Sequence, residues 1–116
     1  MAALADEHCV TTTKLSRRVS EVERAGLLAA LPHWRVIEVD GIERLERRYS
    51  LPDFASALEF TNHVGALAEH EDHHPAIVTE WGRVTVSWWT HTVRGLHRND
   101  FVMAAQTDRI YTRASS

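Results

Sequence analysis

The sequence contains little glycine and proline, one cysteine and no long hydrophobic run. Five glycines and three prolines among 116 residues argue against a collagenous, elastic or largely disordered chain. Cys9 is the only cysteine, so no disulfide can form within the chain and nothing indicates secretion. The longest apolar run, Leu27–Leu31, is far shorter than the ~20 residues that span a bilayer. We therefore expect no membrane contact.

An excess of positive charge is also lacking. The formal net charge is −3 and the isoelectric point is about 6.2, which disfavours direct nucleic-acid binding through bulk phosphate attraction. The first ten residues include Asp6 and Glu7 and lack the basic start and apolar block of a signal peptide. A cytoplasmic protein is the expectation. With 44% hydrophobic and 25% charged residues, the chain suits one compact domain.

Helical and strand patterns alternate along most of the chain. Residues 1–18 show no sustained periodicity and are expected to form a flexible N-terminal tail, with the domain at 19–113. Ser20 and Glu23 have the spacing of a helix capping box, and Asp40-Gly41 is typical of a two-residue hairpin turn. The expected elements are a helix at 20–31, strands at 34–39 and 42–49, a helix at 52–72, strands at 76–80 and 84–91, and a helix at 99–111.

Two hairpins separated by a helix predict an α+β domain: a four-stranded antiparallel sheet with three helices packed on one face. The longest helix is expected to end near Asp72, because the residue before Pro75 is pushed away from helical angles. Its buried stripe is predicted from i, i+3, i+4 spacing at Phe54, Ala57, Leu58, Thr61, Val64 and Ala68.

Histidine is the unusual residue of this chain. Six of the eight histidines lie between residues 63 and 97, and imidazole titrates near neutral pH. His70, His73 and His74 have i, i+3, i+4 spacing, so a metal site is one hypothesis, with carboxylate ligands available nearby. Pro75 ends the helix at this point and no cysteine lies close, which favours chemistry without a metal.

Acid–base catalysis is the other hypothesis for these histidines. His73 and His74 follow a helix and His91 ends a strand, and such element ends can converge on one cleft. Two or three imidazoles can donate one proton and accept another in the same site, which is what elimination or addition of water requires. The sequence contains neither a Gly-x-Ser-x-Gly nucleophile elbow nor a glycine-rich phosphate loop.

At these residues the chain resembles the pterin-4a-carbinolamine dehydratases. The family pattern is an acidic residue, three residues, His-His-Pro, and then an aromatic residue, a histidine and an aspartate at longer intervals. Supporting matches extend the resemblance over residues 20–112. The matching residues are Glu69, His73-His74-Pro75, Trp81, His91 and Asp100, with Leu31-Pro32, Trp34, Asp53-Phe54 and Gly95-Leu96 outside the pattern.

The resemblance implies a reaction and roles for the histidines. Family members remove water from a 4a-hydroxytetrahydropterin to give the quinonoid dihydropterin, which recycles the cofactor of aromatic amino acid hydroxylases. His73 and His91 would form the acid and base pair, without a choice of which is which, and His74 would orient the hydroxyl. Glu69 would position a histidine or help to hold the pocket.

The resemblance also implies how the pterin is bound. Backbone groups near Asp72 and at Trp89 and Thr90 would meet the flat donor–acceptor edge of the pterin. Trp34 would supply an aromatic wall, although a buried tryptophan beside a strand is also typical of a core. Trp81 is interpreted as a packing residue, and Asp100 as a carboxylate at a helix start. No metal or cofactor is implied, and members form homodimers or homotetramers.

Three positions depart from the family pattern. Trp89 stands where a small residue is usual, Thr92 where an acidic residue is frequent, and His97 where a Thr or Ser often caps the last helix. Trp89 and Thr92 bring turnover into question and leave an alternative open, a dehydratase-like scaffold that binds a protein client without catalysis. Such relatives assist RuBisCO assembly in carboxysome-bearing bacteria or serve as a dimerisation cofactor of a transcription factor.

Overall fold

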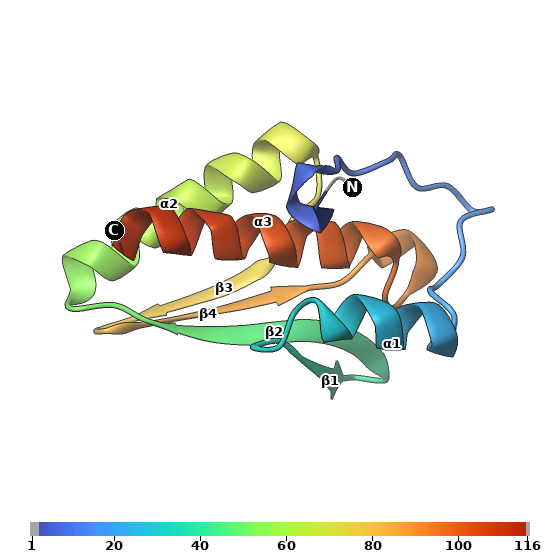
Figure 1. Cartoon of the computed structure of the whole chain (residues 1–116), viewed down its shortest axis with the longest axis horizontal. Helices are drawn as coiled ribbons and strands as arrows, with labels where there is room; N and C mark the ends of the chain where they lie inside the picture. Colours follow the sequence, from blue (N-terminus) through green and yellow to red (C-terminus); the bar gives the residue numbers. More distant parts are fainter. Residues whose placement is uncertain (1–2, 116) are drawn as a thin grey trace.

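The computed structural model describes residues 3–115. Its helices and strands follow the expected order, with two short 3-10 turns in addition (Figure 1). Within the described residues, no helix is both long enough and apolar enough to cross a membrane. The elements are η1 (Leu4–Asp6), α1 (Glu21–Ala29), β1 (Arg35–Val39), β2 (Ile42–Ser50), α2 (Phe54–Glu71), β3 (Ala76–Glu80), β4 (Arg83–Trp88), η2 (His91–Val93) and α3 (Arg98–Ser115).

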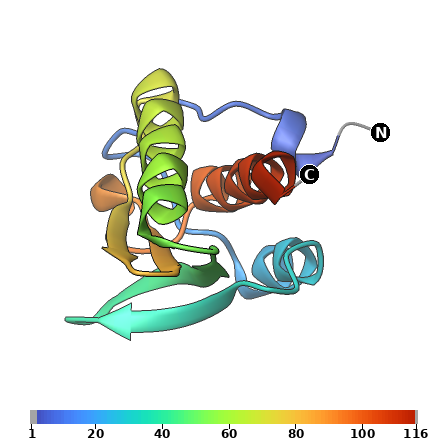
Figure 2. The ribbon, with the colours of Figure 1, turned by 90° about the vertical axis from the view of Figure 1, so that its left-hand side faces the viewer.

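The four strands form one antiparallel sheet in the order β1-β2-β4-β3. The two hairpins therefore pair through β2 and β4 at the centre, where Tyr49 lies opposite Val84. Helices α2 and α3 lie over the same face of the sheet, and α1 lies beside the β1 end (Figure 2). The expected α+β fold, a four-stranded antiparallel sheet with three helices, is confirmed.

The first hairpin turn has the backbone that its sequence predicts. Asp40 and Gly41 both have positive φ values, 53° and 80°, as the favoured two-residue hairpin turn requires. The fourth strand, in contrast, is shorter than the expected 84–91. Strand β4 ends at Trp88, and His91 begins the η2 turn, because Thr90 pairs with Gly95 and folds the chain back on itself.

Polar side chains fix the starts of α1 and α2. The Ser20 hydroxyl accepts the Glu23 N–H at 3.1 Å, and the Asp53 carboxylate accepts the Ser56 N–H at 2.7 Å. Three residues separate the end of α2 at Glu71 from Pro75. Asp72 adopts a left-handed conformation (φ 51°, ψ 46°) and stops the helix itself.

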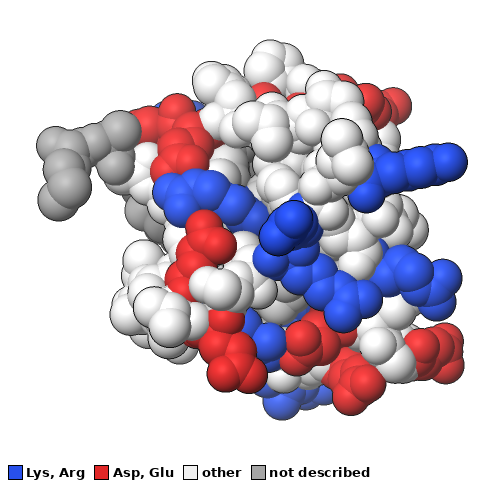
Figure 3. Space-filling model, turned by 90° about the vertical axis from the view of Figure 1, so that its right-hand side faces the viewer, with Lys and Arg blue, Asp and Glu red and all other residues white. Residues whose placement is uncertain are grey.

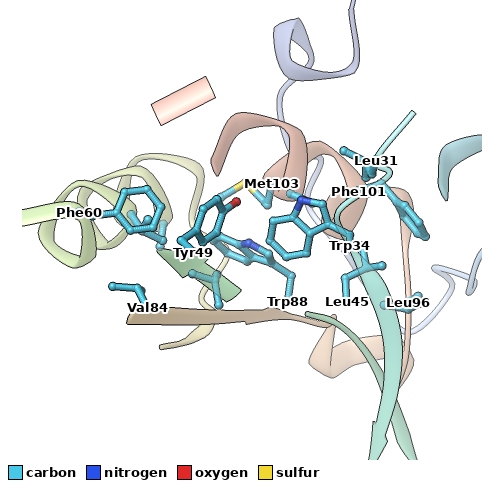
Figure 4. Packing of buried hydrophobic residues seen from close by; sticks show 14 of the residues in the cluster. Leu31, Trp34, Leu45, Tyr49, Phe60, Val84, Trp88, Leu96, Phe101 and Met103 are labelled. Carbon is cyan, nitrogen blue, oxygen red and sulfur yellow. The ribbon is translucent and has the colours of Figure 1, made fainter. Parts of the chain in front are cut away.

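The core lies between the sheet and the two long helices (Figure 4). Tyr49, Phe60 and Trp88 are its large members, each at most 1% exposed. The predicted stripe of α2 is wrong at two positions, since Phe54 and Leu58 are 46% and 45% exposed. Phe60 takes their place because it shares a helical face with Ala57, Val64 and Ala68, which are buried.

Residues 3–19, which we call the N-terminal strap, lie along α3 and across η2. The sequence predicts a flexible tail over most of this segment, and the structure shows it joined to the domain by hydrogen bonds. Glu7 pairs with Arg98, and the Gln106 side chain donates to the Glu7 carbonyl. The Asn99 side chain holds both backbone groups of Val10. Long-range polar contacts thus position a segment that has no periodicity of its own.

Candidate active site

The end of α2 places two neighbouring histidines in different surroundings. The left-handed Asp72 directs its N–H to the last carbonyls of the helix, and the N–H of His73 returns to the carbonyl of Ala68 at 3.1 Å. This cap turns the chain sharply, so the side chains of His73 and His74 leave the helix in different directions. The His73 side chain is only 11% exposed, whereas that of His74 is 54% exposed.

His73 is held by a buried carboxylate. Its Nε2 lies 2.7 Å from Oδ1 of Asp100, an α3 residue whose side chain is fully buried. On its flat side the imidazole stacks on the indole of Trp88, with ring centroids 5.9 Å apart and planes 12° apart. Hydrogen bond and stacking together fix the position and the plane of the ring.

Asp100 joins three segments of the chain. Its second oxygen accepts the Thr90 hydroxyl at 2.7 Å and the His97 N–H at 2.9 Å. The interpretation of Asp100 as a carboxylate at the start of the last helix is correct, because it is the third residue of α3. Its contact with His73 was missed, since the separation of 27 residues carries no sequence signal.

The N-cap of α3 is His97. Its Nδ1 accepts the Asn99 N–H at 3.0 Å, which replaces the usual hydroxyl cap. Burial lowers the pKa of His97 below its ordinary value; the Asp100 carboxylate opposes this shift, and His73 adds to it. An unprotonated Nδ1 is also what the cap requires, so the pKa and the geometry agree.

The acidic residue of the sequence pattern pairs with the second histidine. Oε2 of Glu69 lies 2.6 Å from Nε2 of His74, and both side chains are largely exposed. Each of the adjacent histidines therefore has its own carboxylate, buried for His73 and exposed for His74. An imidazole whose Nε2 faces a carboxylate presents its other nitrogen elsewhere, which fixes its tautomer.

His91 lies in the turn that follows Thr90. It is exposed and is the first residue of η2. Its ring centroid is 5.0 Å from that of Trp89, and the Arg44 guanidinium lies 3.8 Å above the Trp89 ring. Thr90 and His73 bind the two oxygens of one carboxylate, so the His91 turn and His73 lie at the same end of the sheet.

The remaining predicted binding residues differ in what they offer a ligand. The N–H and C=O of Thr90 pair with Gly95, and the N–H of Asp72 caps α2, so these backbone groups already have partners. Trp34 is 5% exposed and donates its indole N–H to Asp108, as a core residue does. Trp81 is 74% exposed, so its interpretation as a packing residue is wrong, because it lies in the β3–β4 turn.

The contacts of Trp89 and Thr92 give no support for a loss of turnover. The Arg44 guanidinium lies over the Trp89 indole, and the Thr92 hydroxyl bonds to that of Thr12 at 2.6 Å. Among residues 3–115, no three His, Cys, Asp or Glu side chains are grouped to hold a metal ion. A surface hollow of about 950 Å³ lies at the other end of α2, where His63 is the one histidine that lines it.

The arrangement is suited to proton transfer. A buried imidazole, His73, and an exposed one, His74, are neighbours in the chain and each faces a carboxylate, while His91 lies in the turn after Thr90. The Cys9 thiol near Asp100 is not suited to nucleophilic attack, because burial, Glu71 and Asp100 raise its pKa to about 12.

Comparison with known proteins identifies the family of this chain. The family model described as pterin 4 alpha carbinolamine dehydratase matches residues 17–110. A protein of Syntrophotalea carbinolica named "Putative pterin-4-alpha-carbinolamine dehydratase" is 51% identical over 95% of this chain and 98% of its own. A protein of the same name from Microcystis aeruginosa is 48% identical over the full length of both chains.

Solved structures show the same fold. A transcriptional coactivator/pterin dehydratase from Brucella melitensis superposes with a TM-score of 0.72 at 34% identity, over 80% of this chain and 97% of its own. A pterin dehydratase-like RuBisCO assembly factor of the alpha-carboxysome superposes with a TM-score of 0.57 over 66% of this chain and 87% of its own. At 23% identity, that likeness shows the fold alone. The matched residues and the relatives together establish that this chain belongs to the pterin-4a-carbinolamine dehydratase family.

Proposed function

We propose that this protein dehydrates 4a-hydroxytetrahydropterin to the quinonoid dihydropterin by acid–base catalysis with histidine. The observation that carries the proposal is the pairing of His73 with the buried Asp100, beside the turn that presents His91. Membership of the dehydratase family and about 50% identity to relatives of that name support it.

The reaction needs two proton transfers, and the site offers groups for both. The hydroxyl on C4a leaves as water once it receives a proton, and N5 loses its proton as the C4a–N5 double bond forms. His73 and His91 are the proposed acid and base, and His74, steadied by Glu69, orients the hydroxyl. The Asp100 carboxylate holds the His73 ring in position through its contact with Nε2.

Backbone hydrogen-bonding groups would hold the flat pterin ring. The carbonyls of Asp72 and Trp89 are the proposed acceptors, because the N–H groups of Asp72 and Thr90 already have partners. Trp34 is buried in the core. In this proposal it supports the residues packed around it and does not contact the substrate.

Stopped-flow decay of 4a-hydroxytetrahydropterin tests the proposal. The wild-type protein should accelerate decay over buffer, and His73→Ala and His91→Ala should each lower kcat by about 100-fold or more, since each removes a general acid or base. His33→Ala, which alters an exposed loop histidine, is the matched control. If wild-type protein gives no acceleration, the enzyme hypothesis fails and a role in binding a protein client takes its place.

We further propose that the protein is a homodimer or homotetramer, as the family resemblance implies. Exposed apolar side chains support this: Phe54 and Leu58 on α2, and Val78 on β3 with Trp81 beside it. Strand β3 also lies at an edge of the sheet, where its outer backbone groups can pair with a second copy. Light scattering of Trp81→Glu and Leu58→Glu should show a smaller assembly than wild type, and unchanged mass would exclude these surfaces.

A further inference from the structure

The turn that carries His91 is held from outside by the N-terminal strap. Its base is the pairing of Thr90 with Gly95, in which the Thr90 N–H donates to the Gly95 carbonyl at 2.9 Å. Between them lie η2 and Arg94, which has a left-handed backbone (φ 52°). A short turn with one such bridge has little stability of its own, so its position depends on what packs against it.

Arg18 contacts this turn in two ways. Its Nε donates to the Val93 carbonyl at 2.8 Å, which satisfies a backbone acceptor inside the turn. The aliphatic part of the same side chain lies over Gly95. A Cβ atom added at Gly95 would stand 3.0 Å from Nε and 3.1 Å from Cδ of Arg18, closer than such atoms normally approach.

Two further contacts flank Arg18 along the strap. The Val19 N–H donates to the Leu96 carbonyl at 2.9 Å, just after the turn, and the Thr12 and Thr92 hydroxyls lie 2.6 Å apart. The strap therefore meets the turn at Thr92 and Val93 and again just after it, at Leu96. Figure 3 views this end of the molecule, where Lys and Arg side chains form a band between acidic ones.

We propose that Arg18 is a positioning residue for His91, holding the 90–95 turn in place by its bond to Val93 and by its fit over Gly95. The effect on catalysis rests on the proposed dehydratase function. Gly95 has no positive φ, so its backbone would tolerate alanine, but the Arg18 side chain would have to move by a few tenths of an ångström to admit a Cβ there.

A double-mutant cycle tests the fit between these two residues. Arg18→Ala and Gly95→Ala should each lower kcat by about tenfold with little change in KM, because a displaced general acid or base loses transition-state contact. The double variant should be no worse than either single one, because removing the Arg18 side chain makes room for the new Cβ. Arg18→Lys, which keeps the aliphatic stem and a donor, should restore kcat toward wild type.

The control is Arg17→Ala. Arg17 is an exposed neighbour that makes no hydrogen bond or ion pair with residues 3–115, so kcat should stay at the wild-type value. Losses that add up in the double variant, or a wild-type kcat in Arg18→Ala, would overturn the proposal.

A readout independent of turnover separates this proposal from the proposed function. The imidazole signals of His91 in carbon–proton correlation spectra, assigned by their loss in His91→Gln, should shift or broaden in Arg18→Ala and in Gly95→Ala. The signals of His73, which Asp100 and Trp88 hold, should stay in place. If His91 shifts in a protein that does not dehydrate the pterin, Arg18 positions the turn and the enzyme hypothesis is lost. If His91 does not respond, Arg18 has no positioning role, whatever the turnover.

Discussion

At the scale of single residues, one buried carboxylate organises the candidate site. Asp100 is bound by the His73 imidazole, the Thr90 hydroxyl and the His97 N–H, which come from three segments of the chain. A fully buried aspartate needs such partners, because an unpaired charge in the interior is strongly unfavourable. Asp100 therefore accepts a hydrogen bond at the start of α3 and also holds the His73 ring.

Asp100→Asn should lower kcat by about tenfold or more. The amide keeps the size of the side chain but has one acceptor oxygen instead of two. If that oxygen accepts the Thr90 hydroxyl and the His97 N–H, the NH2 group faces Nε2 of His73, and the ring must take up the other tautomer. Stopped-flow kinetics measure the effect. Asp53→Asn, a matched change at the far end of α2 that preserves the cap, should leave kcat unaltered. Equal kcat values in wild type and Asp100→Asn would show that His73 works without this partner.

His97→Asn should make the stability of the protein less dependent on pH. The pKa of His97 in the folded protein is below the ordinary 6.5, so the unfolded chain takes up the proton more readily. The free energy of unfolding of the wild type should therefore fall as the pH drops from 6.5 through the folded-state pKa, while the asparagine cap does not titrate. Urea unfolding at about pH 7.5, 6 and 5 checks this. Parallel pH curves for the two proteins would contradict it.

At the scale of elements, helix ends decide where the functional side chains point. Asp53 starts α2, and the left-handed Asp72 ends it in a cap that sends His73 inward and leaves His74 exposed. A helix continued by one more turn would have placed both histidines on the helix surface. The three-residue gap between the end of α2 and Pro75 therefore matters to the chemistry as well as to the fold.

Asp53→Ala should lower the free energy of unfolding and the urea midpoint, because α2 loses its N-cap. The bond from the Ser56 N–H to the Asp53 carboxylate is lost, and that N–H turns to water because the site is exposed. Asp53→Asn should cost little. Urea denaturation measures both variants, and equal losses in the two would mean that the charge at this helix end, and not the hydrogen bond, is what stabilises it.

At the scale of the whole molecule, the strap is attached by two kinds of contact. Its first part uses carboxylates: Glu7 bonds to Arg98, and Glu71 accepts the Cys9 N–H and faces His8. Its second part uses bonds without a carboxylate, such as those from Arg18 to Val93 and from Val19 to Leu96. The two parts should therefore respond differently to acid.

Acidification should release the first part of the strap before the second. The Arg98 bond lowers the pKa of Glu7, and for Glu71 burial raises the pKa but the Cys9 and histidine bonds outweigh it, so both lie below the ordinary 4.5. Their contribution is complete above pH 4.5 and is lost as the pH falls through the lowered values. Hydrogen-exchange protection of the Cys9 amide should drop in this range, and that of Val19 should persist. Simultaneous loss at both amides would indicate global unfolding.

The sequence by itself determined the class of fold, the hairpin turn and the family. These features depend on residues close together in the chain. Helix and strand periodicity, the Asp40-Gly41 turn and the spacing of the histidines can therefore be recognised in a single sequence. Sequence periodicity did not predict which of two similar faces of α2 is buried. Leu58 was expected inside and is exposed, whereas Phe60 is buried.

Only the tertiary structure decided which groups face each other around the histidines. The pairing of His73 with Asp100 and the fit of Arg18 over Gly95 join residues far apart in the chain, and their types are common in unrelated roles. The course of the strap was decided in the same way, because most of its hydrogen bonds go to other parts of the domain, among them α2, η2 and α3. Contacts of this kind depend on the folded arrangement of whole elements, which residue spacing does not encode.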